Sequence, residues 1–275
     1  MTPSVFDTDL LVEIGLTADL LNEIEQQRKR VGNRRGALTR TGADSDGEFR
    51  GHGYREDSYP VLLLDAYLDE LAVQEARMVK ALEKTMKRHP LASWIAAQRG
   101  LGLKQLGRLL ATLEDPSWHP VEERPRTLDE LTAYCGLVPG YRRARGVPAD
   151  EVPQWNAEAR MRVYLIANQV VKMLRPECKV VAEDGSYTVR HTVTCPCGAY
   201  RRLYDERKAF KRDAMHTVDC VRCGPSGHPA LTGSPWSDAH RHGDALRYVG
   251  KRILRDLYRE ARRANGYPDE VVTAA

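Results

Sequence analysis

Apolar residues recur at helical spacing along most of this 275-residue chain, and this periodicity constrains the fold more than any other feature. It is strongest in two long stretches. One runs from about Asp244 to Arg263, and the other runs from Tyr59 to Lys87 and stops before Pro90. In the second stretch, the apolar residues seven positions apart are Leu64, Leu71 and Met78. We therefore predict a mainly α fold.

The residues before Pro90 are expected to form three parts. Residues 1–30 are predicted to be helical with Thr17 as N-cap, and residues 31–58 are predicted to be a basic, polar, flexible arm because they almost lack apolar residues. Residues 59–90 are predicted to form one long coiled-coil-like helix. This helix either packs on a second copy of the chain or lies along its own domain. We expect a homo-oligomer through residues 59–87.

Residues 91–175 are predicted to form a helical domain that opens with a helix-hairpin-helix. Its turn is Gly100-Leu101-Gly102, followed by Lys104. Small residues let such a turn approach a nucleic-acid backbone, and amides at a helix N-terminus bind phosphate. Gly100, Gly102 and Lys104 are therefore candidate nucleic-acid-binding residues. Further helices are expected at about Leu128–Cys135 and at about Ala157–Leu174, the latter with Asn156 as N-cap.

Residues 176–235 differ in character and are predicted to form a small β-hairpin and zinc-knuckle insertion. Segments rich in β-formers, Lys179–Glu183 and Ser186–Thr194, flank Asp184-Gly185, which is a strong hairpin signal. Residues 236–275 are predicted to contain the closing amphipathic basic helix and a tail.

Four cysteines in this insertion form two close pairs, Cys195 with Cys197 and Cys220 with Cys223, and 22 residues separate the pairs. Tetrahedral zinc takes four thiolates from two such pairs. We predict one structural Zn²⁺ held by these cysteines, with no open position for catalysis. Reduced, buried cysteines are the alternative. The spare candidate ligands are Cys178, His191 and His216.

A second metal pattern lies just before the closing helix, where Asp238, His240, His242 and Asp244 alternate. Such ligands chelate a catalytic metal when they leave a strand into a loop. Here the pattern runs into a helix, on which residues two positions apart diverge. We therefore interpret Asp244 as a helix N-cap rather than as a ligand.

The positive charge is local, because the net charge of the whole chain is only +4. Clusters of this kind either contact phosphates or form a solvated helix face. No stretch is apolar enough to span a membrane and the first residues do not form a secretory signal, so the chain is expected to be cytoplasmic. The clustered cations are Arg28, Lys29, Arg30, Arg34, Arg35 and Arg40, then Arg241, Arg247, Lys251, Arg252, Arg255, Arg259, Arg262 and Arg263.

Three blocks of this sequence resemble the C-terminal transposase domain of the insertion sequence 110 family of bacterial recombinases. The first covers Trp94–Leu110 and the second Leu128–Pro139, which contains the family's Tyr-x-Gly-Leu-x-Pro pattern. The third is Trp155–Arg162, where Arg160 and Arg162 match the family's helix. The resemblance resumes at Tyr200–Tyr204 and Ala245–Arg259. It covers roughly half of the chain.

This resemblance implies an oligomeric DNA-binding protein directed by a structured RNA. The family combines an N-terminal RNase-H-like domain, which holds a metal cluster, with a serine that precedes a glycine after the Gly-Leu-x-Pro segment. In this chain Arg145 precedes Gly146 at that place, and about 58 residues precede the long helix. We expect neither catalytic part here.

The sequence thus predicts a DNA-binding protein related to insertion-sequence transposases, without autonomous catalysis. Structured RNA is a second candidate ligand. One alternative is a divergent recombinase that is active with a partner chain, and another is a zinc-containing scaffold for protein assembly. The candidate phosphate-binding residues outside the glycine turn are Arg142, Arg143, Arg145, Arg160 and Arg162.

Overall fold

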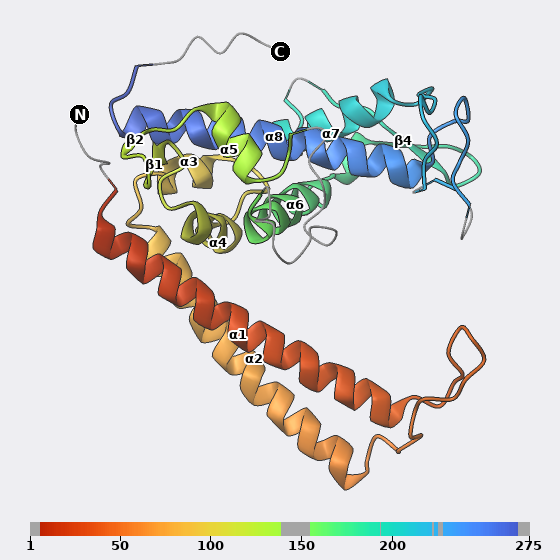
Figure 1. Ribbon diagram of the computed structural model, residues 1–275. Coiled ribbons are helices and arrows are strands. Elements are labelled where there is room, and N and C mark those ends of the chain that lie inside the picture. The colour runs from red at the N-terminus through yellow and green to blue at the C-terminus, as the bar shows by residue number, and fades with distance from the viewer. Residues whose placement is uncertain (1–5, 139–154, 193, 222, 225–227, 269–275) are drawn as a thin grey trace. The chain divides into compact units, whose positions relative to one another are not determined.

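The structure, a computed structural model, describes residues 6–138, 155–192, 194–221, 223–224 and 228–268. As predicted, it is mainly helical, with two small antiparallel sheets of two strands each (Figure 1). The chain divides into two units, Thr8–His89 and the remainder. The elements are α1 (Thr8–Thr39), α2 (Tyr59–Met86), α3 (Ala92–Ala97), α4 (Leu103–Leu113), β1 (Trp118–His119), β2 (Arg124–Pro125), α5 (Leu128–Tyr134), α6 (Ala157–Val171), the short 3₁₀ helix η2 (Pro176–Cys178), β3 (Lys179–Val181), β4 (Tyr187–Val189), α7 (Ala199–Phe210) and α8 (Asp238–Ala264).

The first unit is a hairpin in which α1 and α2 pack side by side along their length (Figure 1). Leu71 and Leu82 of α2 are buried, while Leu64 and Met78 are partly covered. Between the predicted alternatives, the structure therefore shows α2 packed on a helix of its own unit. Self-association through residues 59–87 stays a prediction.

The expected flexible arm over residues 31–58 is wrong in its first part, because α1 continues to Thr39. Arg28 Nε lies 2.6 Å from Glu75 Oε2, and Arg35 Nε lies 2.6 Å from Asp65 Oδ1, so carboxylates of α2 pair with this basic stretch. Thr17 is not the N-cap. It lies inside α1, where its hydroxyl donates to the Glu13 carbonyl at 2.7 Å.

In the second unit, α8 packs against α5, α6 and α7. Its buried face contributes roughly 1.5–3 kcal/mol for each large aliphatic side chain. The helix begins at Asp238 rather than at Asp244, because Ser237 is its N-cap and accepts a hydrogen bond from the His240 amide at 3.2 Å. The prediction that Asp244 caps the helix is therefore wrong. The buried large aliphatics of α8 are Leu246, Val249, Ile253, Leu254 and Leu257.

Two short helices joined by a turn, α3 and α4, lie at residues 91–114, as the spacing predicts, and the helix-hairpin-helix as a DNA-binding unit stays a prediction. Gly100 has a φ of +88°, and a Cβ there would lie 2.9 Å from Met173 Cγ. The backbone conformation and the packing of this turn therefore require glycine at position 100, whether or not the turn contacts a nucleic acid. Gly102 is the N-cap of α4 and is exposed, with nothing within 4 Å of the place of a Cβ.

The predicted hairpin at Asp184-Gly185 is confirmed, with shorter strands than expected. β3 pairs with β4, and Val180 lies opposite Thr188. Asp184 Oδ1 accepts from the Ser186 amide at 2.9 Å, and Gly185 has a φ of +79°. The predicted N-cap Asn156 is confirmed too, since its side chain accepts from the Ala159 amide at 2.9 Å.

A capping box fixes the start of α5. Thr127 Oγ1 accepts from the Glu130 amide at 3.2 Å, and Glu130 Oε2 accepts from the Thr127 amide at 2.8 Å. We expect Thr127→Ala to lower the free energy of unfolding by about 1 kcal/mol, because one amide loses its partner. Thr127→Ser keeps the hydroxyl and is the matched control in denaturant unfolding. Equal stability of the two variants would contradict the box.

Within the described residues, no helix combines the length and the apolar character that crossing a bilayer requires.

Candidate metal centres and a basic pocket

The six cysteines are all free thiols, and five of them belong to two groups that include histidine. Centre A contains Cys178, His191, Cys195 and Cys197, and centre B contains His216, Cys220, Cys223 and His240. Within each centre the candidate ligand atoms all lie within 4.8 Å of one another. The prediction of one four-cysteine site is therefore wrong in its grouping. The two pairs belong to different centres, and histidines complete each set.

Centre A joins the end of η2, the loop after β4 and the approach to α7. Cys178 Sγ lies 3.0 Å from Cys195 Sγ and 3.5 Å from Cys197 Sγ. His191 Nδ1 lies 3.1 Å from Cys195 Sγ. Cys178 and Cys197 are buried, so this centre is largely closed to solvent.

The ring of His191 is held in place from its far side. Its Nε2 lies 2.8 Å from Asp205 Oδ2, and both Asp205 oxygens accept from Arg201, at 2.6 Å and 2.7 Å. A carboxylate on the outer nitrogen of a ligating histidine fixes the tautomer and raises ligand basicity. The arrangement presents Nδ1 to the sulfur atoms.

The thiols of centre A differ in acidity. Burial raises the pKa of Cys195, but hydrogen bonds from the Cys178 thiol, the Cys197 amide and His191 outweigh it and lower that pKa to about 6. The hydrogen bond to Cys195, together with burial, raises the pKa of Cys178 to about 12. Cys195 is therefore the first thiolate of this group. Thiolate is the form of cysteine that ligates metals.

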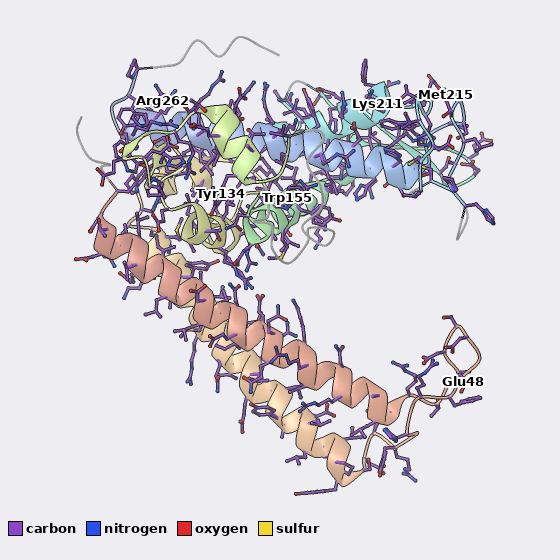
Figure 2. All side chains as sticks on the ribbon, in the orientation of Figure 1. Glu48, Tyr134, Trp155, Lys211, Met215 and Arg262 are labelled. Carbon is purple, nitrogen blue, oxygen red and sulfur yellow. The ribbon has the colours of Figure 1, made fainter. Side chains whose placement is uncertain are left out.

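Centre B joins the loop after α7 to the first turn of α8. Cys223 Sγ lies 3.2 Å and Cys220 Sγ 3.6 Å from His240 Nδ1. Backbone pairing between Cys220 and Ala230 holds this loop closed. Lys211 and Met215, labelled in Figure 2, lie in the stretch that leads from α7 into centre B.

Two further features shape centre B. A Cβ at Gly224 would lie 1.8 Å from the His228 carbonyl oxygen, so the turn after Cys223 requires glycine. The ring of Trp236 stacks on that of His240, with centroids 4.1 Å apart and planes 14° apart. Centre B thus combines a tight turn at Gly224 with a histidine, His240, whose ring is held by stacking on Trp236.

Both centres have the dimensions of a tetrahedral zinc site. With bond lengths of about 2.0–2.3 Å, neighbouring ligand atoms lie about 3.3–3.8 Å apart. The distances of 3.5 Å in centre A and 3.6 Å in centre B lie in this range, and those of 3.0 and 3.1 Å in centre A and 3.2 Å in centre B lie slightly below it. The residues could therefore hold one metal ion in each centre.

The sequence indicated some of these ligands and missed one. Cys178, His191 and His216 were expected as spare ligands and now belong to the centres. His240 was set aside with its neighbours, although it belongs to centre B. Of those neighbours, His242 Nδ1 lies 2.6 Å from the Tyr204 hydroxyl, and Asp244 Oδ2 accepts from Arg207 at 2.6 Å.

A separate cavity of about 300 Å³ carries most of its charge as cations. Arg160 of α6, Arg207 of α7, and Arg247 and Lys251 of α8 line it, together with the carboxylate of Asp244. Its remaining lining residues are Gly136, Leu137, Val138 and Tyr248. We call this site the basic pocket.

Contacts inside the basic pocket orient its cations. Asp244 pairs with Arg207 at 2.6 Å and with Arg247 at 3.6 Å. The Arg207 guanidinium also lies over the ring of Tyr248, 5.2 Å from its centroid. Arg160 lies over the ring of Trp155 at 5.2 Å. Among the described residues one carboxylate faces four cations, so this part of the lining is positive.

No protein-family model, no curated protein and no solved structure matches this chain.

Only some of the predicted nucleic-acid-binding residues lie at the basic pocket. Arg160 lines the basic pocket, whereas Arg162 is buried, 5% exposed, with its NH2 3.0 Å from Glu158 Oε1. Lys104 lies in the first turn of α4, next to Gly102. Val138 lines the pocket, and Trp155, labelled in Figure 2, lies under Arg160. Arg142, Arg143 and Arg145 lie outside the described residues.

Proposed function

We propose that this chain is a DNA-binding protein related to insertion-sequence transposases and that it lacks autonomous catalysis. The basic pocket is the observation that carries the proposal. Side chains from three helices converge there, so the positive charge is built by the fold and is not a solvated face of one helix. A cavity that gathers guanidinium and ammonium groups in this way suits a phosphate.

The side chains of the pocket suit a phosphodiester in particular. Guanidinium groups donate pairs of hydrogen bonds to phosphate oxygens, and Asp244 aligns Arg207 and Arg247 for this. Tyr248 is 39% exposed beside them and offers an aromatic surface next to the charge. Arginines with an adjacent aromatic ring are a common combination at nucleic-acid sites.

The position of the pocket agrees with the resemblance to the insertion sequence 110 family. Gly136, Leu137 and Val138 come from the Tyr-x-Gly-Leu-x-Pro segment, and Arg160 comes from the next block. Arg247 and Lys251 come from the closing helix. Stretches that carry the resemblance and are far apart in sequence thus line one cavity. This supports a shared site, and the family relationship stays part of the proposal.

We propose structural Zn²⁺ as the ion of the Cys/His centres. Mixed cysteine and histidine ligands in a four-ligand set suit zinc, and four protein ligands leave no open position. The turn that carries Gly100 lies against centre A, since a Cβ at Gly198 would lie 2.8 Å from Arg99 Cβ. A metal there would support this turn. We place the protein in the cytoplasm, where thiols stay reduced.

The test is a binding isotherm on duplex DNA at two salt concentrations. Four phosphate contacts predict a slope of log K against log salt of about −3.6, and roughly 100-fold weaker binding at about 200 mM than at about 50 mM. Binding that is absent or independent of salt would overturn the proposal. Tighter binding to structured RNA than to DNA would assign the pocket to RNA instead.

A zinc-containing scaffold for protein assembly is the second candidate, and exposed apolar side chains near centre B favour it. Val218 is 70% exposed, Val221 82% and Leu231 67%. Apolar groups of this kind suit a protein surface better than a phosphate backbone. The scaffold predicts a zinc-containing oligomer that is indifferent to DNA, which sedimentation with and without duplex would show.

A further inference from the structure

We infer that each chain binds two zinc ions in independent sites of unequal lability, centre A retaining its ion and centre B exchanging it first. The inference rests on the proposed zinc but not on nucleic-acid binding. The two ligand sets share no residue. Two ions in one cluster would require a bridging thiolate, whereas each centre supplies four ligands of its own. The sites are therefore mononuclear.

Centre A has the features of a site that holds its ion. Cys197 is fully buried and Cys178 is 4% exposed, so a chelator has little access. The Arg175 amide donates to Cys197 Sγ at 3.2 Å, and the Cys197 amide lies 3.4 Å from Cys195 Sγ. Amide donors of this kind stabilise thiolate charge.

The outer shell of centre A adds to this retention. Asp205 fixes the ring of His191, and Arg201, itself 5% exposed, fixes Asp205. Loss of such a second partner typically weakens metal affinity about 10–100-fold. Release of the ion from centre A therefore requires opening of a buried network.

Centre B is more open, yet its geometry also calls for an ion. His216 is the one ligand of the four that is buried, at 5% exposed, and its Nε2 has no hydrogen-bond partner within the described residues. A buried imidazole with an unpartnered nitrogen, in one group with two thiols and a second imidazole, is what a metal would satisfy. The other three ligands, including His240, are partly exposed.

The structural role of centre B is to fix the start of α8. His240 lies in the first turn of that helix, and Ser237, its N-cap, lies 3.1 Å from Cys223 Sγ. First turns fray, because their amides lack intrahelical partners. From Ala245 onward the helix is anchored by its buried face. Loss of the ion from centre B therefore frees one turn and leaves the core intact.

The experiment measures zinc release from the full chain, without nucleic acid, to the chromogenic chelator 4-(2-pyridylazo)resorcinol. We expect two zinc ions per chain and two phases of equal amplitude. Tryptophan fluorescence should change in the fast phase, because Trp236 stacks on His240. Cys223→Ser should abolish the fast phase and leave the slow one. Trp236→Phe should remove most of the fluorescence change and keep both phases.

The sixth cysteine supplies the control. Cys135 is buried outside both centres, and Cys135→Ala should keep two zinc ions and both phases. Cobalt titration of the unmodified chain gives a readout that needs no variant, since the sulfur-to-cobalt absorption should reflect three thiolates in centre A and two in centre B. One zinc per chain, a single release phase, or a fast phase that survives in Cys223→Ser would overturn the inference. None of these outcomes bears on DNA binding.

Discussion

Cys197→Ser should release one zinc ion per chain and lower the free energy of unfolding by at least about 3 kcal/mol, because a structural zinc ion, bound with about 10–16 kcal/mol in zinc-finger peptides, stabilises only the folded state. Cys197 has no exposed surface, and its sulfur lies 3.5 Å from Cys178 Sγ. A serine hydroxyl is a poor zinc ligand. It would also leave the Arg175 amide, now 3.2 Å from the sulfur, with a weaker partner.

The local consequence should be loss of the β3–β4 hairpin. Its strands have three residues each and are mostly exposed, and an isolated two-stranded hairpin is at best marginally stable in water. Cys178 is the last residue before β3, and His191 lies two residues after the end of β4. Centre A therefore joins the two ends of the hairpin that lie opposite its turn.

Denaturant unfolding and amide hydrogen exchange, with zinc content measured on the same samples, check this prediction. Fast exchange should appear at Lys179–Val189 in Cys197→Ser. The matched control is Cys135→Ala, which also alters a fully buried cysteine and should keep both metal ions. Wild-type zinc content and stability in Cys197→Ser would refute the role of centre A.

Periodicity and local turn chemistry predicted much of the fold of the second unit. Buried stripes on α8 and α6 and the Asp184-Gly185 hairpin all follow from spacing or from one turn residue. Each is a local effect that a short sequence window contains. The start of α8 was missed because its cap, Ser237, precedes the amphipathic stretch, whereas the predicted end at about Arg263 is close to the observed end at Ala264.

The grouping of the ligands could not be read from spacing. The two cysteine pairs look like one set in sequence, but α7 lies between them, and its 12 residues extend about 18 Å. That helix carries the chain away from Cys197 before Cys220 is reached. Ligands on the flanking elements, Cys178 and His240, complete the two sets instead.

The helical state of residues 31–39 was missed for a related reason. Composition alone describes this stretch as basic and nearly free of apolar residues. Its partners are distant in sequence, because Arg35 pairs with Asp65 on α2. The same limit applies to the basic pocket. Arg160 was predicted as a phosphate contact, but nothing near Arg207 in the sequence indicates such a role. Arg207 lines the pocket only because α7 packs on α8.

Reversing two charges of the basic pocket should weaken DNA binding at least about 100-fold. The variant is Arg160→Glu with Lys251→Glu, which leaves the Asp244 pairs with Arg207 and Arg247 in place. Loss of two phosphate contacts alone predicts about 30-fold weaker binding at 0.15 M salt, and the new carboxylates add repulsion. The salt slope should become shallower by about 2.

The matched control makes the same change of net charge on the other unit, with Arg77→Glu and Lys80→Glu on the exposed surface of α2. If long-range attraction to the whole chain caused the binding, both variants would lose affinity equally, and the pocket would have no special role. If the pocket binds the phosphodiester, the control should stay within a few-fold of the unmodified chain at 0.15 M salt, because Arg77 and Lys80 do not line the pocket and salt screens exposed charges. Unchanged thermal unfolding of both variants would show that the difference arises at the site.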